Sequence, residues 1–338
     1  MVGLLNARIA RRIATAAAYG GGGISVLSAS LYGFLRLQAR VARKAISGVP
    51  ISDPPDPNGE YGSFHGRPIS FAVLGDSCAA GYGVDTPEET PGGLLAAGLA
   101  EIAERPVRLT SVAQGGARSA DLEGQVDQAL VAMPDVALII VGGNDVTHQV
   151  PPATAVRSLI DAVRALRAAG CEVVVGTCPD LGTIRPIRPP LRWLARRWSR
   201  QLAAAQTFAV VDAGGRSVSL GSLLGPEFAA SPAELFSADQ FHPSSAGYAH
   251  AAAAILPSLA SALGLWTDED HTLDADQHAV VPISVAAAEA ADHGGTEVAA
   301  TTVDGAETGP HGRWVRLRDH TTAAHIEDEP ETPYPSPR

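Results

Sequence analysis

ISFAVLGDSCAAGYG, residues 69–83, joins a short apolar run to a turn made of small residues. The run is rich in β-branched and aromatic side chains and does not alternate with polar ones, which is typical of a strand covered on both faces. The glycines beyond it permit a tight turn and a close approach of the backbone. The stretch therefore predicts a buried strand over 69–75 whose carboxyl end presents the hydroxyl of Ser77.

Four more runs of the same kind follow along the chain, at 107–112, 136–142, 171–177 and 208–212. Longer segments with helical spacing accompany them, at 92–104, 119–130, 153–169, 191–205 and 244–263. This alternation predicts an α/β fold with a parallel sheet, helices on both faces and right-handed crossovers. Reactive groups in such folds gather beyond the carboxyl ends of the strands, so the residues that follow each strand are the candidates for function.

Composition divides the chain into regions. Residues 51–66 are rich in Pro, Gly and Asp and predict a linker, so the folded domain is expected over 67–265. Residues 266–338 hold 15 acidic residues against four arginines, which accounts for the whole net charge of −11, and we expect a largely disordered tail there. The neutral remainder carries no basic stripe with interleaved aromatic residues, so nucleic acid is not an expected partner.

The first 50 residues form a separate basic and apolar segment, in which an uncharged stretch at 13–35 lies between two groups of cations. These cations are Arg8, Arg11 and Arg12 before the stretch and Arg36, Arg40, Arg43 and Lys44 after it. About 23 residues can cross a bilayer, so one interpretation is a membrane anchor or export signal. The other is a basic helix that lies on a membrane or on the domain. Membrane association through 8–44 and a membrane-associated or exported location are therefore expected, with a cytoplasmic location as the alternative.

The cysteines do not indicate a disulfide framework or a metal site. Cys171 and Cys178 are expected near opposite ends of one strand, roughly 20 Å apart, and Cys78 follows the first strand. The spacings of known zinc motifs are absent from the sequence, and we expect neither a metal nor a cofactor. The sequence leaves the oligomeric state open.

Three short motifs carry groups that could act chemically. Ser77 follows the first strand, Asn144 lies in Gly-Gly-Asn-Asp after the third, and Asp239-Gln-Phe-His-Pro precedes the last helix. An aspartate three residues before a histidine can reach the ring Nδ1, which fixes the tautomer of His242 and leaves Nε2 free to accept a proton. Each motif alone also has a structural interpretation: a helix cap, a turn and a structural hydrogen bond.

Taken together and in this order, the motifs resemble the first, third and fifth blocks of the SGNH (GDSL) hydrolases, over residues 69–264. The resemblance implies a flavodoxin-like three-layer sandwich with a five-stranded parallel sheet. It also implies a serine esterase or lipase-like enzyme, with Ser77 as nucleophile, His242 as general base and Asp239 orienting that base.

The same resemblance implies an oxyanion hole built from the backbone N–H of Ser77, the N–H of Gly116 and the side-chain amide of Asn144. The second block of the family fits less well at 111–119, because Ser111 stands where the family usually has Asn. Gly115 therefore stays an alternative donor.

Two residues near these motifs are candidates for contact with the substrate. Arg118 replaces a common Thr of the family and could bind an anionic group, and His148 follows the amide donor. Both also fit an ordinary role at the surface, and Asp145 beside Asn144 is expected to be a loop or surface group.

The expected reaction is cofactor-independent hydrolysis of a carboxylic ester through an acyl-enzyme, the substrate being a short- or medium-chain acyl ester, a lipid or an acetylated sugar. Thioester hydrolysis and a non-catalytic, membrane-anchored binding module stay open as alternatives. The basic and aromatic stretch 180–198 predicts either a lid or membrane-facing helix, or an amphipathic helix whose tryptophans pack on the sheet.

Overall fold

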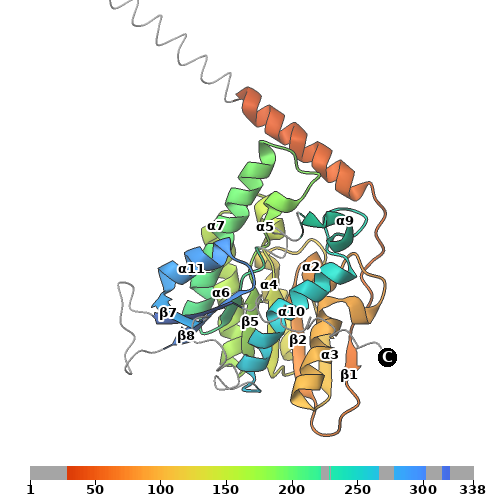
Figure 1. Cartoon of the computed structure of the whole chain (residues 1–338), viewed down its shortest axis with the longest axis vertical. Coiled ribbons are helices and arrows are strands. Elements are labelled where there is room, and N and C mark those ends of the chain that lie inside the picture. Colours follow the sequence, from red (N-terminus) through yellow and green to blue (C-terminus); the bar gives the residue numbers. More distant parts are fainter. Residues whose placement is uncertain (1–28, 222–227, 229, 266–277, 302–313, 320–338) are drawn as a thin grey trace, which may run out of the picture.

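The computed structural model describes residues 29–221, 228, 230–265, 278–301 and 314–319 (Figure 1). Five parallel strands form the centre of its sheet, in the order β3-β2-β4-β5-β6. They are β2 (Ile69–Gly75), β3 (Val107–Ser111), β4 (Val136–Ile140), β5 (Glu172–Gly176) and β6 (Arg216–Val218). This order confirms the predicted flavodoxin-like fold, because the first strand of the five lies between the second and the third.

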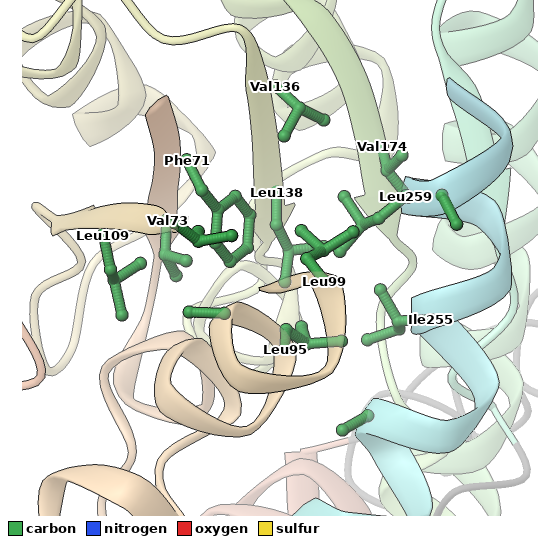
Figure 2. Packing of buried hydrophobic residues seen from close by; sticks show 14 of the residues in the cluster. Phe71, Val73, Leu95, Leu99, Leu109, Val136, Leu138, Val174, Ile255 and Leu259 are labelled. Atoms are coloured by element: carbon green, nitrogen blue, oxygen red, sulfur yellow. The ribbon is translucent and has the colours of Figure 1, made fainter. Parts of the chain in front are cut away.

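Two layers of helices cover the sheet. One layer is α3 (Pro91–Ala103) and α10 (Ser245–Ala262), and the other is α4 (Leu122–Leu130), α6 (Pro152–Ala168) and α7 (Leu191–Asp212). Successive side chains of β2 point to opposite faces of the sheet. Phe71 and Val73 pack in a first cluster against α3 and α10 on one face. Ala72 and Leu74 pack against the helices of the other layer. Figure 2 shows Leu95 and Leu99 of α3 and Ile255 and Leu259 of α10 beside the side chains of the first cluster.

The prediction of a strand over 208–212 is wrong. These residues are the last turn of α7, in which Val210 and Val211 are fully buried. The chain then turns through Gly214, and the fifth parallel strand is only three residues long. A short apolar run with two valines can be a buried strand or the buried end of a helix. The run alone therefore could not distinguish a helix from a strand here.

Part of the segment 266–338, where we expect a largely disordered tail, is folded. The described elements there are β7 (His278–Pro282), α11 (Ile283–Asp292), β8 (Thr296–Thr301) and β9 (Trp314–Asp319). They continue the sheet beyond β6 in the order β8-β9-β7, with antiparallel pairing throughout. Ile283, Val298 and Val315 are buried in a cluster with Val211 of α7, so a few dispersed apolar residues hold a segment whose average composition is polar. The remainder of the tail lies outside the described residues.

Glu297, an acidic residue of the tail, is buried inside the protein. Glu297 of β8 accepts hydrogen bonds from Arg216 Nη1 at 2.9 Å and from Ser258 Oγ at 2.8 Å. It thereby links the tail to both β6 and α10. Burial of a carboxylate is tolerated where a cation and further donors surround it.

The described elements before the parallel core are a helix over 29–47 and β1 (Gly59–Tyr61). β1 pairs antiparallel with β3, so the predicted linker 51–66 contributes an edge strand. Residues 1–28, which include most of the predicted 13–35 segment, lie outside the described residues. Within the described part of the chain, no helix has both the length and the apolar character needed to cross a bilayer.

Candidate active site

The turn after β2 is fixed by its backbone. Gly75 has φ +135°, and a Cβ at this position would lie 1.9 Å from the carbonyl oxygen of Ile140 in β4. The side-chain amide of Gln125 holds the same residue from α4, because it accepts from Gly75 N at 2.7 Å and donates to Gly75 O at 2.9 Å. Only glycine fits here, and the turn places Ser77 at the start of the short helix α2 (Ser77–Ala80).

Asp76 caps α2 from a buried position. Its Oδ1 accepts from Cys78 N at 3.0 Å, and the residue is 4% exposed. Burial raises the pKa of Asp76 to about 7, and the negative charge of Asp145 adds to this, although the Cys78 N–H and His242 oppose the shift. The carboxyl group therefore ionises near neutral pH instead of near pH 4.

Asp76→Asn is expected to stabilise the protein at alkaline pH. Between pH 3.8 and about 7 the unfolded chain ionises while the native carboxyl stays protonated, so native stability falls as the pH rises through this window. Asparagine is an equally good cap and cannot ionise, so the gain in the free energy of unfolding should be on the order of 2–4 kcal/mol at about pH 8 and absent at about pH 4. Urea unfolding at the two pH values measures it. Asp85→Asn, at an exposed aspartate, is the control, and an equal gain at both pH values would contradict the prediction.

Ser77, His242 and Asp239 form one chain of hydrogen bonds. Ser77 Oγ lies 2.9 Å from His242 Nε2, and His242 Nδ1 lies 2.7 Å from Asp239 Oδ2. Ser77 is separated from the other two by more than 160 residues, and the fold joins them at the carboxyl edge of the sheet. All three are buried, so these bonds form away from bulk water.

The loop that precedes α10 holds Asp239 rigidly. Its Oδ1 accepts from Ser237 Oγ at 2.7 Å, from Phe241 N at 2.9 Å and from His242 N at 3.0 Å. Burial raises the pKa of Asp239, but the hydrogen bonds from the His242 ring and from the backbone outweigh it and hold the pKa below its ordinary value. The carboxylate is thus charged and pointed at Nδ1.

Aromatic side chains fix the plane of the imidazole. The ring of Tyr82 stacks on His242 with centroids 5.4 Å apart, and Phe241 meets it edge to face at 4.8 Å. Tyr82 is itself anchored, because its carbonyl accepts from the hydroxyl of buried Tyr248 at 2.8 Å. The ring can therefore keep Nε2 on Ser77 at little cost in conformational entropy.

The loop after β3 carries Gly116 and contacts Asn144, two of the predicted oxyanion donors. Gly116 has φ +80° in a turn closed by the bond from Ala117 N to Gln114 O at 3.2 Å. Asn144, in α5 (Gly143–Thr147), donates from Nδ2 to Ala117 O at 3.0 Å, which ties its amide to this loop. A Cβ on Gly115 would lie 2.6 Å from the Tyr82 hydroxyl, so Gly115 is required by packing and Gly116 by its backbone. Within the described part of the chain, the N–H of Gly116 has no hydrogen-bond acceptor.

Asp145 is a buried residue of the site, and the expectation that it lies at the surface is wrong. It is 1% exposed, and its Oδ2 accepts from Ser119 N and Ser119 Oγ, each at 3.0 Å. Burial raises the pKa of Asp145, although Ser119 and the charge of Arg118 oppose this. The carboxylate joins α5 to the segment that follows Gly116, so it positions both parts of the oxyanion loop. Its place beside Asn144 was the one signal in the sequence.

Arg118 and His148 lie on the same side as the site but form no hydrogen bond with the three linked residues in the described part of the chain. The Arg118 side chain is 44% exposed, with Nε 4.0 Å from Asp121 Oδ2. His148 is exposed at the end of α5, with Nδ1 2.8 Å from Asn144 O. Both keep exposed atoms that a substrate could meet. The described residues contain no group of three or more His, Cys, Asp or Glu side chains that could hold a metal ion.

The chain is similar to known proteins in both sequence and structure. Residues 73–250 match the sequence model of the GDSL-like Lipase/Acylhydrolase family. A GDSL-like esterase of Mycobacterium tuberculosis is 47% identical over 197 residues, which cover 58% of this chain and 63% of that protein, so over a third of the relative is unmatched. Among solved structures, TesA is 22% identical with a TM-score of 0.46, covering 57% of this chain and 99% of TesA. An acetylxylan esterase of Geobacillus stearothermophilus is 18% identical with a TM-score of 0.44, covering 58% and 94%.

Proposed function

The chain belongs to the GDSL-like lipase/acylhydrolase family, and from this premise we propose that it hydrolyses carboxylic esters with Ser77 as the nucleophile. The observation that carries the proposal is the continuous hydrogen-bond chain from Ser77 Oγ through His242 to Asp239. The esterase name of the M. tuberculosis relative supports the same class of reaction. The substrates we propose are short- or medium-chain acyl esters, lipids or acetylated sugars.

Acylation begins when His242 Nε2 takes the proton of Ser77 as Oγ bonds to the carbonyl carbon of the ester. A serine hydroxyl is a weak nucleophile at neutral pH, and this general-base assistance contributes about 10²–10⁴-fold. Asp239 stabilises the imidazolium that forms. The tetrahedral intermediate then expels the alkoxide, which receives the proton from His242 and leaves as the alcohol.

Deacylation repeats these steps with water. His242 removes a proton from a water molecule while its oxygen bonds to the acyl carbon. The bond to Ser77 Oγ then breaks, and His242 returns the proton to that oxygen. The products are a carboxylic acid and free enzyme, and no cofactor or metal enters the balance.

The negative charge on the carbonyl oxygen is met by the N–H of Ser77, the N–H of Gly116 and one N–H of the Asn144 amide. Asn144 uses only one of its two amide hydrogens on Ala117 O, so the second is left for the oxyanion. Each such donor contributes on the order of 3 kcal/mol in the transition state, because it is oriented before the charge appears. The N–H groups of Gly115 and Gly116 both have no acceptor among the described residues, and we assign the donor to Gly116 because the resemblance of 111–119 to the family's second block implies it.

Asn144→Ala is expected to lower kcat by roughly 10²–10³-fold with a smaller effect on KM, because the amide contributes mainly in the transition state. Steady-state hydrolysis of an aryl ester measures both constants. The matched control is Thr147→Ala on the same short helix, whose hydroxyl bonds, among the residues described, to Asn144 O and to the His148 ring. A loss confined to KM, or an equal loss in the control, would contradict the assignment of Asn144 to the oxyanion hole.

A panel of substrates tests the proposed function on the full chain. We expect aryl acetate, aryl octanoate or an acetylated sugar to be hydrolysed, and a fluorophosphonate probe to label the protein at Ser77. If an acyl thioester is hydrolysed faster than the esters, the proposed substrate would be a thioester. Failure of the probe to label the native protein would overturn it, because only an activated serine reacts.

A further inference from the structure

The amino-terminal helix (residues 29–47) is held against the body by one of its sides only. The Gln38 amide bonds the backbone of the 180–198 stretch, donating to Pro189 O at 2.8 Å and accepting from Leu191 N at 3.4 Å. Ala42 is buried, and it packs in a cluster with Ile187 and with Val146 of α5. The side that carries Gln38 and Ala42 is thus a docked face, and the other sides of the helix are mostly exposed in the part of the chain that the structure describes.

The open sides are divided between apolar and cationic residues. Phe34, Leu37 and Val41 follow each other at helical spacing and are 49–58% exposed. The adjacent side carries the cations Arg36, Arg40, Arg43 and Lys44. Residues 29–52 contain no acidic residue, so nothing within this segment neutralises the four charges. Apolar and basic stripes side by side are the pattern of a helix that lies in the plane of a membrane interface.

The stretch against which this helix packs is also basic and carries an exposed aromatic residue. Residues 181–211 contain no acidic residue and six arginines, namely Arg185, Arg188, Arg192, Arg196, Arg197 and Arg200. Arg196 lies 3.2 Å from Asp180, and Arg200 pairs with Asp292. Trp193 of α7 is 67% exposed, contrary to the interpretation that it packs on the sheet. Tryptophan is enriched where protein meets the headgroup region of a bilayer.

We propose that the amino-terminal helix and the first turns of α7 together bind the surface of an anionic lipid bilayer, with the helix lying in the interface. Charge complementarity selects this partner, because residues 1–265 are neutral as a whole and yet concentrate ten cations in the helix over 29–47 and the adjoining residues 181–200. A polyanion such as nucleic acid would account for the cations but not for the exposed stripe of Phe34, Leu37 and Val41. The proposal does not depend on the proposed function.

The amino-terminal helix packs close to the loop that carries His242. The cluster that buries Ala42 also contains Leu235 of α9 (Pro232–Leu235) and, at its margin, Phe241 beside His242. In Figure 1 the amino-terminal helix, in red, crosses the end of the molecule where α2, α5 and α9 are labelled. The bound bilayer would therefore lie near the edge of the sheet that holds Ser77.

Binding of the full chain to vesicles tests the proposal. The protein carries Ser77→Ala so that no lipid is hydrolysed, and the vesicles are phosphatidylcholine with or without phosphatidylglycerol. We expect binding that requires phosphatidylglycerol and weakens with salt, and a roughly 30-fold weaker affinity for the double variant R36Q/R40Q. The double variant F34S/L37S should also lose binding at low salt. The matched control R157Q/R164Q, which removes two exposed arginines of α6, should bind like the parent.

All variants retain residues 1–28, so a difference between R36Q/R40Q and its control reports on the described surface alone. Equal affinity of these two variants for anionic vesicles would overturn the proposal. So would binding to heparin that is lost in R36Q/R40Q while vesicle binding is unchanged, because the partner would then be a polyanion. In the Ser77 background the same variants should hydrolyse a soluble aryl ester at the parental rate, which separates failure of membrane binding from failure of the proposed function.

Discussion

Ser77→Ala is expected to lower kcat/KM by at least about 10⁴-fold for every ester that the protein hydrolyses. The Ser77 Oγ is the atom that lies 2.9 Å from His242 Nε2, so its removal leaves the base without a proton to accept. The oxyanion donors and the binding surface stay in place, and they alone account for the activity that remains. Initial rates with an aryl acetate measure the effect, and fluorophosphonate labelling should disappear in parallel.

The matched control is Ser70→Ala in the same strand, because its hydroxyl bonds Ala132 O near the opposite end of β2. It should keep full activity and full labelling. Ser77→Ala should unfold at the same temperature as the parent, since alanine is tolerated at the start of a helix turn. Substantial hydrolysis by Ser77→Ala would remove the serine mechanism from the proposal.

Asp239→Asn is expected to reduce kcat about 10³–10⁴-fold while the fold is kept. Its Oδ1 would still accept from Ser237, Phe241 and His242, so the loop geometry survives. The new amide group would occupy the position of Oδ2 and donate toward Nδ1. The imidazole would then carry its proton on Nε2, facing Ser77, in the tautomer that cannot accept the serine proton.

The same substitution should change the response of stability to acid. The pKa of Asp239 is held below its ordinary value in the native state, so its charged form stabilises the fold at neutral pH and this contribution is lost as the pH falls below about 4. Asp239→Asn should therefore be less stable than the parent near neutral pH and should approach it in acid. Asp161→Asn, at an exposed aspartate of α6, is the control. Full activity of Asp239→Asn would show that the carboxylate only caps the loop.

The parallel core could be predicted from the sequence because its strands are short, β-branched and bounded by turn residues. The predicted strand at 69–75 has the same bounds as β2. The error at 208–212 has a physical reason: Val210 and Val211 are buried by a helix layer, and burial of either kind leaves the same apolar signature. The folded part of the tail could not be predicted, because Val298 and Val315 lie far apart in the sequence and become one cluster only through long-range pairing.

In the site, too, local sequence motifs could be recognised, whereas features that depend on long-range contacts could not. Local signals pointed to Ser77, Asn144, Asp239 and His242, since each lies in a short motif with specific residues. The conformation of Gly116 and the packing of Gly115 could not be predicted, because φ is a property of the folded loop and the obstacle at Gly115 is the distant Tyr82. Burial of Asp145 was hidden for a similar reason, as its partner Ser119 comes from another part of the chain.

The position of β9 between β8 and β7 also bears on how the molecule is made. A ribosome releases the five parallel strands first, and β8 can then cover the open side of β6, yet β8 keeps an unpaired side of its own until residues 314–319 emerge. The finished sheet therefore cannot exist before residue 319 has been synthesised. During that interval nascent chains present a row of unsatisfied backbone groups, which is the stage of biosynthesis at which a chaperone would matter most.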